Sequence, residues 1–180
     1  EQIIAMAASA PDTLVVVDEL YAAFTGDSVL PLVDFAETPN LLVLQSLSKT
    51  AGLAALRIGF AVGHAAVIDR VGRVTGPYDV NSVAVAAAFA ALADQSYVDA
   101  YVAEVLRARD WTVEALQQAG VRHHCDGGNY LLIWPRQPVA EVDAALRGEG
   151  ILIRSMADKP LIDGCFRVSI GTTSQMQRFM

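Results

Sequence analysis

The sequence predicts an α/β protein in which a mostly parallel sheet is followed by a smaller α+β domain. Up to about Gly76, short apolar strands alternate with helical or turn segments, a pattern typical of a twisted parallel sheet. Beyond Gly76 the pattern changes to two helical segments and then to short strands around a further helix. We therefore expect one domain at residues 1–95, a connecting helix at 96–120 and a small α+β domain at 121–180.

Three strands are expected in the first domain. The chain starts in a helix that leads to the apolar strand Leu14–Val17, and Asp18 follows directly. Leu41–Leu44 and Ile58–Val62 are continuous apolar runs, as in strands that are buried on both faces. We expect these faces to be partly bare if the chain is only part of a larger domain.

The two helices that come next differ in composition. Asn81 or Ser82 is a suitable N-cap for the alanine-rich segment Val83–Leu92, which predicts a closely packed helix. The segment from Tyr97 to Ala119 is amphipathic and stops at Gly120, with Val98, Tyr101, Val105 and Leu116 near one stripe. In the small domain we expect strands at Asn129–Trp134, Ile151–Arg154 and Cys165–Ile170, and a helix at Val139–Gly148.

Composition excludes several classes of function. Although 53% of the residues are hydrophobic, charges such as Arg57 and Asp94 interrupt the apolar stretches before the ~18 residues that a membrane-spanning helix needs. No signal sequence opens the chain, so we expect a cytoplasmic protein. The net charge of -7 argues against nucleic acid as a partner. Cys125 and Cys165 lie far apart without CxxC spacing, which favours free thiols.

Two segments carry residues suited to binding pyridoxal 5'-phosphate (PLP). That cofactor needs an amine for covalent attachment, a carboxylate at its ring nitrogen and donors for its phosphate. Lys49, in Gln45-Ser-Leu-Ser-Lys49, would provide the amine and would later move the α-proton of the substrate. Asp18 would keep the ring nitrogen protonated, and Tyr21 would donate to the ring's phenolic oxygen.

The phosphate would be held by hydroxyls and a guanidinium. Ser46 and Ser48 flank the lysine, and Arg57 follows eight residues after it. A forked guanidinium suits a tetrahedral oxyanion better than a single ammonium does. We therefore predict a cofactor site made of Asp18, Tyr21, Ser46, Ser48, Lys49 and Arg57.

These motifs resemble the fold type I PLP-dependent aminotransferases, most closely the histidinol-phosphate aminotransferases. The resemblance spans Val17-Asp-Glu-Leu-Tyr21, Ser46-Leu-Ser-Lys-Thr-Ala-Gly-Leu-Ala-Ala-Leu-Arg57 and the segment 159–172. It implies that Lys49 carries the cofactor, that Asp18 and Tyr21 bind the ring, and that the two serines and Arg57 bind the phosphate. It also implies that residues 1–95 are the C-terminal part of the PLP-binding large domain.

The same resemblance implies a substrate and an assembly. Arg167 matches an arginine that grips the anionic end of the substrate, and Arg154 resembles a second arginine used for the substrate's phosphate. The implied reaction is amino transfer between histidinol phosphate and 2-oxoglutarate in histidine biosynthesis, by a homodimer. Residues 78–82 are expected near the dimer seam. No metal is expected, because His123, His124 and Cys125 are consecutive and no second cluster completes a site.

Three alternatives stay open or are set aside. Threonine-phosphate decarboxylases and aromatic amino acid aminotransferases share this fold and phosphate cup, so the sequence separates them poorly. The chain also resembles only a C-terminal portion of such enzymes, which raises the alternative of a catalytically incomplete fragment. Ser46-Leu-Ser-Lys49 fits the S-x-x-K pattern of serine acyl-transferases, but the companion S-D-N and K-T-G motifs are absent.

Overall fold

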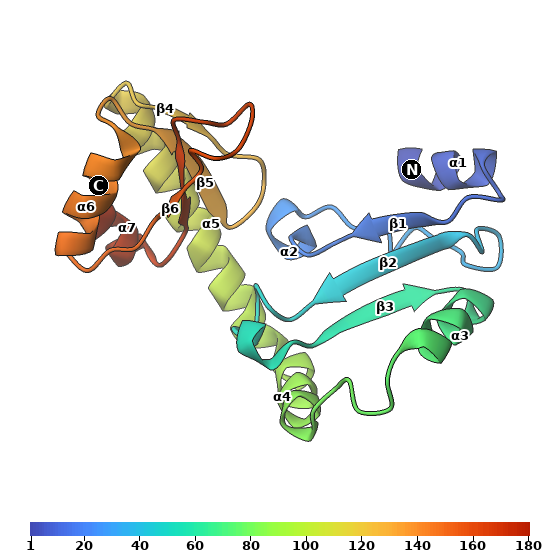
Figure 1. Ribbon diagram of the computed structural model, residues 1–180. Helices are drawn as coiled ribbons and strands as arrows, with labels where there is room; N and C mark the ends of the chain where they lie inside the picture. The colour runs from blue at the N-terminus through green and yellow to red at the C-terminus, as the bar shows by residue number, and fades with distance from the viewer. The chain divides into compact units, whose positions relative to one another are not determined.

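A three-stranded sheet organises residues 1–98, the first of two units into which the chain divides. The computed structural model describes all residues, 1–180, and Figure 1 shows the strands β1 (Val15–Asp18), β2 (Leu41–Ser46) and β3 (Gly59–Gly63) in that order. β1 and β2 are parallel, whereas β2 and β3 are antiparallel. The reversal of β3 follows from its connection: residues 47–58 hold only the short 3-10 helix η1 (Ala54–Leu56), and a parallel return would need a full crossover.

One face of this sheet is covered and the other is partly bare. Helix α1 (Gln2–Ser9) packs Ala7 against Leu41 and Val43 in a buried cluster that also contains Val29. On the opposite face, Val16 of β1 is 50% exposed. This exposure agrees with the prediction from the sequence that the apolar strands of the first domain would have partly bare faces.

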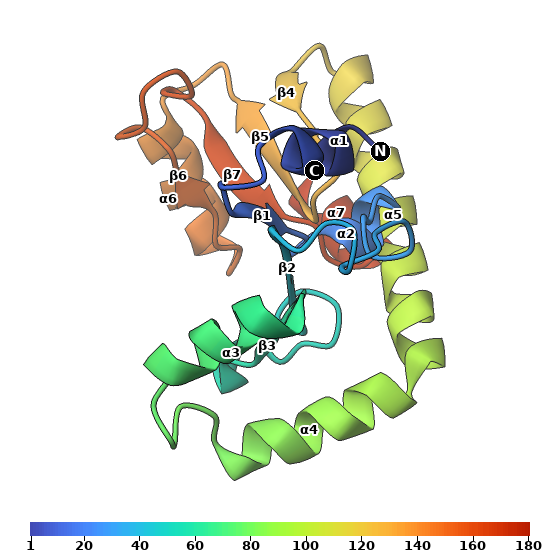
Figure 2. The same ribbon diagram turned by 90° about the vertical axis from the view of Figure 1, so that its right-hand side faces the viewer.

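The remaining helices of the first unit lie between the strands or after them. α2 (Ala22–Thr25) comes directly after the β1 strand end, and α3 (Ala65–Val74) follows β3 and contacts it (Figure 2). α4 (Ser82–Ala93) begins with Asn81, whose Oδ1 accepts a hydrogen bond from Ala84 N at 2.8 Å. The predicted Asn81 cap is therefore confirmed, and Ala84 and Ala88 pack against Ile58.

The second unit, Asp99–Met180, is built on an antiparallel sheet in the order β4-β5-β7-β6. Its elements are α5 (Gln95–Gln118, which begins in the first unit), β4 (Arg122–His124), β5 (Tyr130–Trp134), α6 (Val139–Gly148), β6 (Arg154–Ser155), β7 (Phe166–Ser169) and α7 (Thr173–Phe179). Val105 and Leu116 of α5 are buried, as the amphipathic pattern predicted, and Leu131 of β5 is fully buried. The predicted helix at Val139–Gly148 is confirmed at both ends.

The strand predicted at Ile151–Arg154 is much shorter than expected. Only Arg154 and Ser155 pair with β7. Ile151 is instead hydrogen-bonded to the end of the preceding helix. Gly150 adopts a left-handed conformation with φ 74°, and Ile151 N donates to Leu146 O at 2.8 Å. This arrangement satisfies a free carbonyl at the end of α6, so the chain enters the sheet several residues later than its apolar run predicted.

None of the helices has the length together with the apolar character that crossing a membrane would require.

Candidate active site

The carboxyl ends of β1 and β2 meet at one edge of the first sheet. Asp18, the last residue of β1, pairs with Leu44 of β2, and Ser46 ends β2 two residues later. Because side chains alternate between the faces of a strand, Asp18, Leu44 and Ser46 lie on the same face. The Asp18 carboxylate is exposed and accepts a hydrogen bond from Leu20 N at 3.0 Å.

Ser46 and Ser48 form a pair of adjacent hydroxyls at this edge. Ser46 Oγ lies 2.8 Å from Ser48 Oγ, and it accepts a hydrogen bond from Ser48 N at 3.1 Å. It also lies 3.3 Å from Ile58 O, which connects it to the segment that enters β3. The turn after β2 is thereby held so that two hydroxyls are presented side by side.

Lys49 follows in the same turn and lies near Tyr21. Its Nζ is 5.9 Å from the centre of the Tyr21 ring, within the range of a cation–π contact. Tyr21 precedes α2 as its N-cap residue, three residues after Asp18. The amine and the phenol predicted for the site therefore come together from two separate segments.

Arg57 joins this edge from the segment before β3, in an unusual backbone conformation. Its φ of 55° is left-handed, which costs a non-glycine residue about 1–3 kcal/mol; such residues cluster at functional sites, and Arg57 also ends the short helix η1. Its Nη1 donates to Ala54 O at 3.0 Å, and its neighbour Ile58 contacts Ser46 through the carbonyl described above. The backbone segments that carry the six predicted cofactor residues all reach this edge, with Asp18 at the end of β1, Tyr21 after it, Ser46, Ser48 and Lys49 at and after the end of β2, and Arg57 before β3.

The two arginines predicted for the substrate lie together in the second unit. Arg154 of β6 and Arg167 of β7 are direct partners across the antiparallel ladder, so their side chains leave the same face. The Arg167 guanidinium carbon lies 5.5 Å from the centre of the Tyr130 ring. Neither arginine takes part in the ion pairs of the chain, so the structural salt bridge that would be the ordinary role of Arg167 is not formed.

Sequence reasoning missed Glu19, which is buried with its carboxylate fully engaged. It accepts hydrogen bonds from Ser28 Oγ at 2.8 Å, Val29 N at 2.7 Å and Gln45 Nε2 at 3.0 Å. Only 8% of Glu19 is exposed. The available signal was the position of this carboxylate directly after an apolar strand, one residue beyond Asp18 and therefore on the other face.

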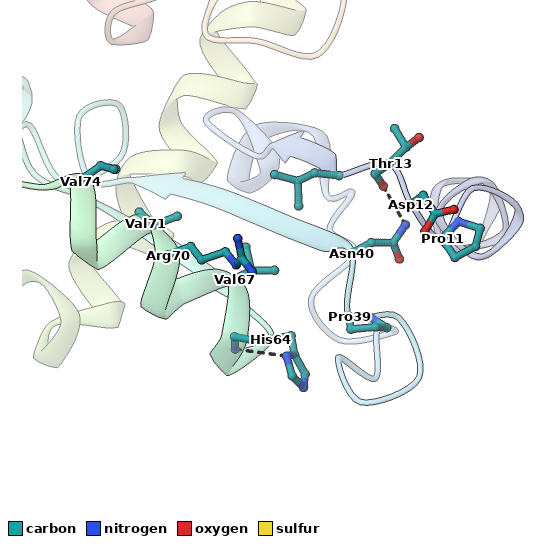
Figure 3. A pocket seen from close by; sticks show the side chains of 12 residues that line it. Pro11, Asp12, Thr13, Pro39, Asn40, His64, Val67, Arg70, Val71 and Val74 are labelled. Atoms are coloured by element: carbon teal, nitrogen blue, oxygen red, sulfur yellow. Dashed lines mark hydrogen bonds between the residues drawn. The ribbon is translucent and has the colours of Figure 1, made fainter.

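A cavity lies at the opposite edge of the same sheet, away from the predicted cofactor residues. It has a volume of about 790 Å³ and is lined by segments that precede β1 and β2 and by α3, including Leu14, Asn40, His64 and Arg70 (Figure 3). Asn40 Nδ2 lies 2.9 to 3.0 Å from the carbonyls of Ala7, Ala10 and Thr13, which ties the α1–β1 turn to β2. None of the predicted site residues lines this cavity.

The cysteines and histidines form no further site. Cys125 and Cys165 are both free, and burial raises the pKa of the Cys165 thiol, which donates to Ile162 O at 2.9 Å. His123 and His124 lie in β4, and no group of three His, Cys, Asp or Glu side chains is arranged around a metal position.

Comparison with known proteins identifies the family of the chain. The family described as aminotransferase class I and II matches residues 1–180. The chain belongs to this family. It is 37% identical over 171 residues to histidinol-phosphate aminotransferase 1 of Pseudomonas fluorescens, a match that covers 93% of the chain and 48% of the relative.

Two solved structures of the family's fold are similar over nearly the whole chain. L-threonine-O-3-phosphate decarboxylase from Porphyromonas gingivalis is 26% identical with a TM-score of 0.82, covering 99% of this chain and 56% of that one. Histidinol-phosphate aminotransferase from Sinorhizobium meliloti, solved in complex with pyridoxal-5'-phosphate, is 23% identical with a TM-score of 0.78, covering 98% and 50%. The chain therefore has part of the fold of these enzymes, and it spans about half the length of the relatives it matches.

Proposed function

We propose that the protein is a PLP-dependent aminotransferase that exchanges an amino group between histidinol phosphate and 2-oxoglutarate in histidine biosynthesis. The observation that carries this proposal is the gathering of an amine, a carboxylate, a phenol, two hydroxyls and a guanidinium at one sheet edge. The similarity to histidinol-phosphate aminotransferase 1 of Pseudomonas fluorescens supports the choice of substrate.

The residues at this edge fit the chemistry of PLP. The Asp18 carboxylate is exposed, with only a local backbone hydrogen bond, so it can pair with the protonated ring nitrogen. The Ser46 and Ser48 hydroxyls would hold the phosphate together with Arg57, whose fork matches an oxyanion. Tyr21 would donate its phenolic proton to the oxygen on the ring.

Lys49 would do the proton transfer. When bound, PLP supplies an electron sink that stabilises negative charge at the α-carbon of an amino substrate. The Lys49 amine would hold the cofactor covalently and, once the substrate had displaced it, would be free to take the α-proton. Asp18 would keep the sink effective by holding a proton at the ring nitrogen, and Tyr21, against which Lys49 lies, would limit the positions that the amine can take.

Arg154 and Arg167 would bind the anionic groups of the substrates. Two like charges placed directly opposite each other on a sheet repel, and a bound phosphate or carboxylate removes that cost. Arg167 would take the anionic group common to both substrates, and Arg154 would assist with the phosphate of histidinol phosphate. This need for a doubly charged group favours a phosphorylated amino compound over a plain aromatic acid.

A homodimer in the cytoplasm is part of the proposal. α4 is apolar around its whole circumference, and Val83, Phe89 and Leu92 are more than half exposed. A helix of this composition is normally buried. In this scheme residues 1–95 are the C-terminal part of the cofactor domain, and 96–120 connect it to the small domain at 121–180. Residues 78–82 lie near the interface with a second subunit.

Two other candidates have support from the comparisons. The similarity to L-threonine-O-3-phosphate decarboxylase favours decarboxylation of a phosphorylated amino acid as the second candidate, since the same arginine pair would serve that substrate. The aromatic amino acid aminotransferases remain a weaker alternative. The third candidate is a catalytically incomplete fragment, supported by the coverage of about half of each relative.

Covalent trapping of the cofactor tests the proposal directly. The chain contains only two lysines, Lys49 and Lys159, so borohydride reduction after incubation with PLP can leave a stable adduct at these two side chains or at the α-amino terminus. We expect peptide mass spectrometry to find the adduct at Lys49. Before reduction, the absorbance band of the imine should be lost in Lys49→Ala and kept in the matched control Lys159→Ala. Labelling of both lysines alike would contradict the proposal.

The substrate is tested with the protein at its natural length. We expect glutamate to form from 2-oxoglutarate fastest with histidinol phosphate, more slowly with phenylalanine, and without release of carbon dioxide from threonine phosphate. Carbon dioxide release from threonine phosphate would favour the decarboxylase. Turnover by the protein at its natural length, but not by residues 1–180 alone, would favour the incomplete fragment.

A further inference from the structure

Glu19 connects the two strand ends that carry the candidate cofactor residues. Its backbone N donates to Leu44 O at 2.8 Å, which extends the β1–β2 pairing one residue beyond Asp18. Its carboxylate accepts a hydrogen bond from Gln45 Nε2 at 3.0 Å, and Gln45 is the residue directly before Ser46. The buried side chain of Glu19 therefore connects β1, next to Asp18, with β2, next to Ser46.

The same carboxylate also holds the loop that follows α2. Ser28 Oγ and Val29 N donate to it at 2.8 and 2.7 Å, and Val29 belongs to the buried cluster under the sheet. All three partners donate to Glu19, and a carboxylate accepts all three bonds, whereas a carboxamide has one accepting oxygen and would need the Ser28 hydroxyl and the Gln45 amide to turn. Hydrogen bonds to a buried charged group are also stronger than neutral ones.

Glu19 lies on the face of the sheet opposite Asp18 and Ser46. Consecutive residues of a strand point to opposite faces, and Glu19 and Gln45 each neighbour a candidate ligand without sharing its face. Glu19 therefore acts on the site through the backbone of β1 and through Gln45. A single rigid cofactor contacted by Asp18 at one end and by Ser46 at the other requires a constant spacing between these strand ends.

We propose that Glu19 is a positioning residue that sets the spacing between the ring-binding end of β1 and the phosphate-binding end of β2. This inference rests on the proposed function, because it assigns the two strand ends to the two ends of PLP. It predicts that the Glu19–Gln45 contact controls cofactor affinity and orientation, whereas the Glu19–Ser28 contact controls only the stability of the loop.

Matched substitutions separate the two contacts. In the protein at its natural length, we expect Glu19→Gln and Gln45→Ala to weaken PLP binding about tenfold, the effect of one lost charged hydrogen bond. At saturating cofactor, the induced circular dichroism per bound PLP should also change, because the ring is held at a different angle. Ser28→Ala should lower the thermal midpoint and leave both cofactor measurements within about twofold of the unsubstituted protein.

A double exchange provides the rescue. Combining Glu19→Gln with Gln45→Glu restores a carboxylate–carboxamide contact between the strands in reversed order, and we expect it to recover PLP affinity while the loop stays weakened. Equal effects of Gln45→Ala and Ser28→Ala on cofactor affinity, or an unchanged affinity in Glu19→Gln, would overturn the inference. Failure of the unsubstituted protein to form an adduct at Lys49 would overturn the proposed function itself, and the inference with it.

Discussion

Arg154 and Arg167 face each other directly across the β6–β7 ladder, and neither forms an ion pair, although the charge of Arg154 attracts the exposed Asp158 carboxylate. Two guanidiniums in this arrangement destabilise the sheet unless an anion lies between them. Arg167 is partly compensated by its position over the Tyr130 ring, whereas Arg154 is exposed. Protein stability should therefore depend on whether an anion is bound.

Removal of Arg154 should have opposite effects with and without phosphate. In low salt, Arg154→Gln should raise the free energy of unfolding by about 0.2–1 kcal/mol, because the like-charge pair is relieved. Added inorganic phosphate should stabilise the unsubstituted protein more than this variant at equal ionic strength. Thermal unfolding with phosphate and with sodium chloride measures both effects. Arg147→Gln, which removes the same charge from an ion pair with Asp143, is the control and should keep the full phosphate response.

Gly59 should be irreplaceable by alanine. It pairs with Ser46, and a Cβ at this position would lie 2.7 Å from Gln45 O, closer than real contacts allow. We expect Gly59→Ala to lower the free energy of unfolding by about 1–3 kcal/mol, because β3 must move away from β2. It should also weaken PLP binding, since the separation of β3 from β2 breaks the contact between Ile58 O and Ser46 Oγ.

Gly72 is the matched control for this substitution. It lies inside α3 with open space around it, so Gly72→Ala should stabilise the protein by about 0.5–1 kcal/mol through the higher helix propensity of alanine. Urea unfolding of both variants gives the comparison. Equal effects in the two positions would contradict the close approach of β3 to β2.

Glu104 should make stability depend on pH in the acidic range. Its carboxylate accepts a hydrogen bond from Thr173 N at 2.8 Å, at the start of α7, and pairs with Arg107. The Thr173 contact, followed by Arg107, lowers the pKa of Glu104 below 4.5. Its contribution is therefore complete above pH 4.5 and is lost as the pH falls through the lowered pKa of the folded state.

Glu104→Gln tests this dependence. The variant should be less stable than the unsubstituted protein at about pH 6 and should approach it as the carboxylate becomes protonated. Urea unfolding across the acidic range measures the difference. A constant gap between the two proteins at every pH would show that the charge of Glu104 does not contribute.

Leu161 should tolerate glycine unusually well. It is 96% exposed with a left-handed φ of 72°, a conformation that favours glycine over leucine. We expect Leu161→Gly to change the free energy of unfolding by less than about 0.5 kcal/mol, because relief of strain offsets the added flexibility of the unfolded chain. Leu152→Gly, at an exposed position with ordinary φ, should destabilise the protein by about 0.5–1 kcal/mol. Similar losses at both positions would contradict the strain at Leu161.

Local patterns predicted most elements of this chain. Alternating and continuous apolar runs located β1, β2, β3, β5 and β7, and the polar residues after them identified Asp18, Ser46 and Lys49 as candidates. Asn81 was recognisable as a cap because the interaction spans only three residues. These features depend on neighbours in sequence, so one chain is sufficient to infer them.

Tertiary structure decided what depends on distant partners. β3 runs antiparallel because its connection is too short for a crossover, and β6 shrinks because Ile151 completes the end of α6. Glu19 acquires its role only when Ser28, Val29 and Gln45 converge on it from separate segments. The residue types suited to cofactor chemistry, and the strand ends near which they occur, can be read from the sequence alone. Only the pairing of strands decided that they share one edge, because register is set by contacts that no short window of sequence contains.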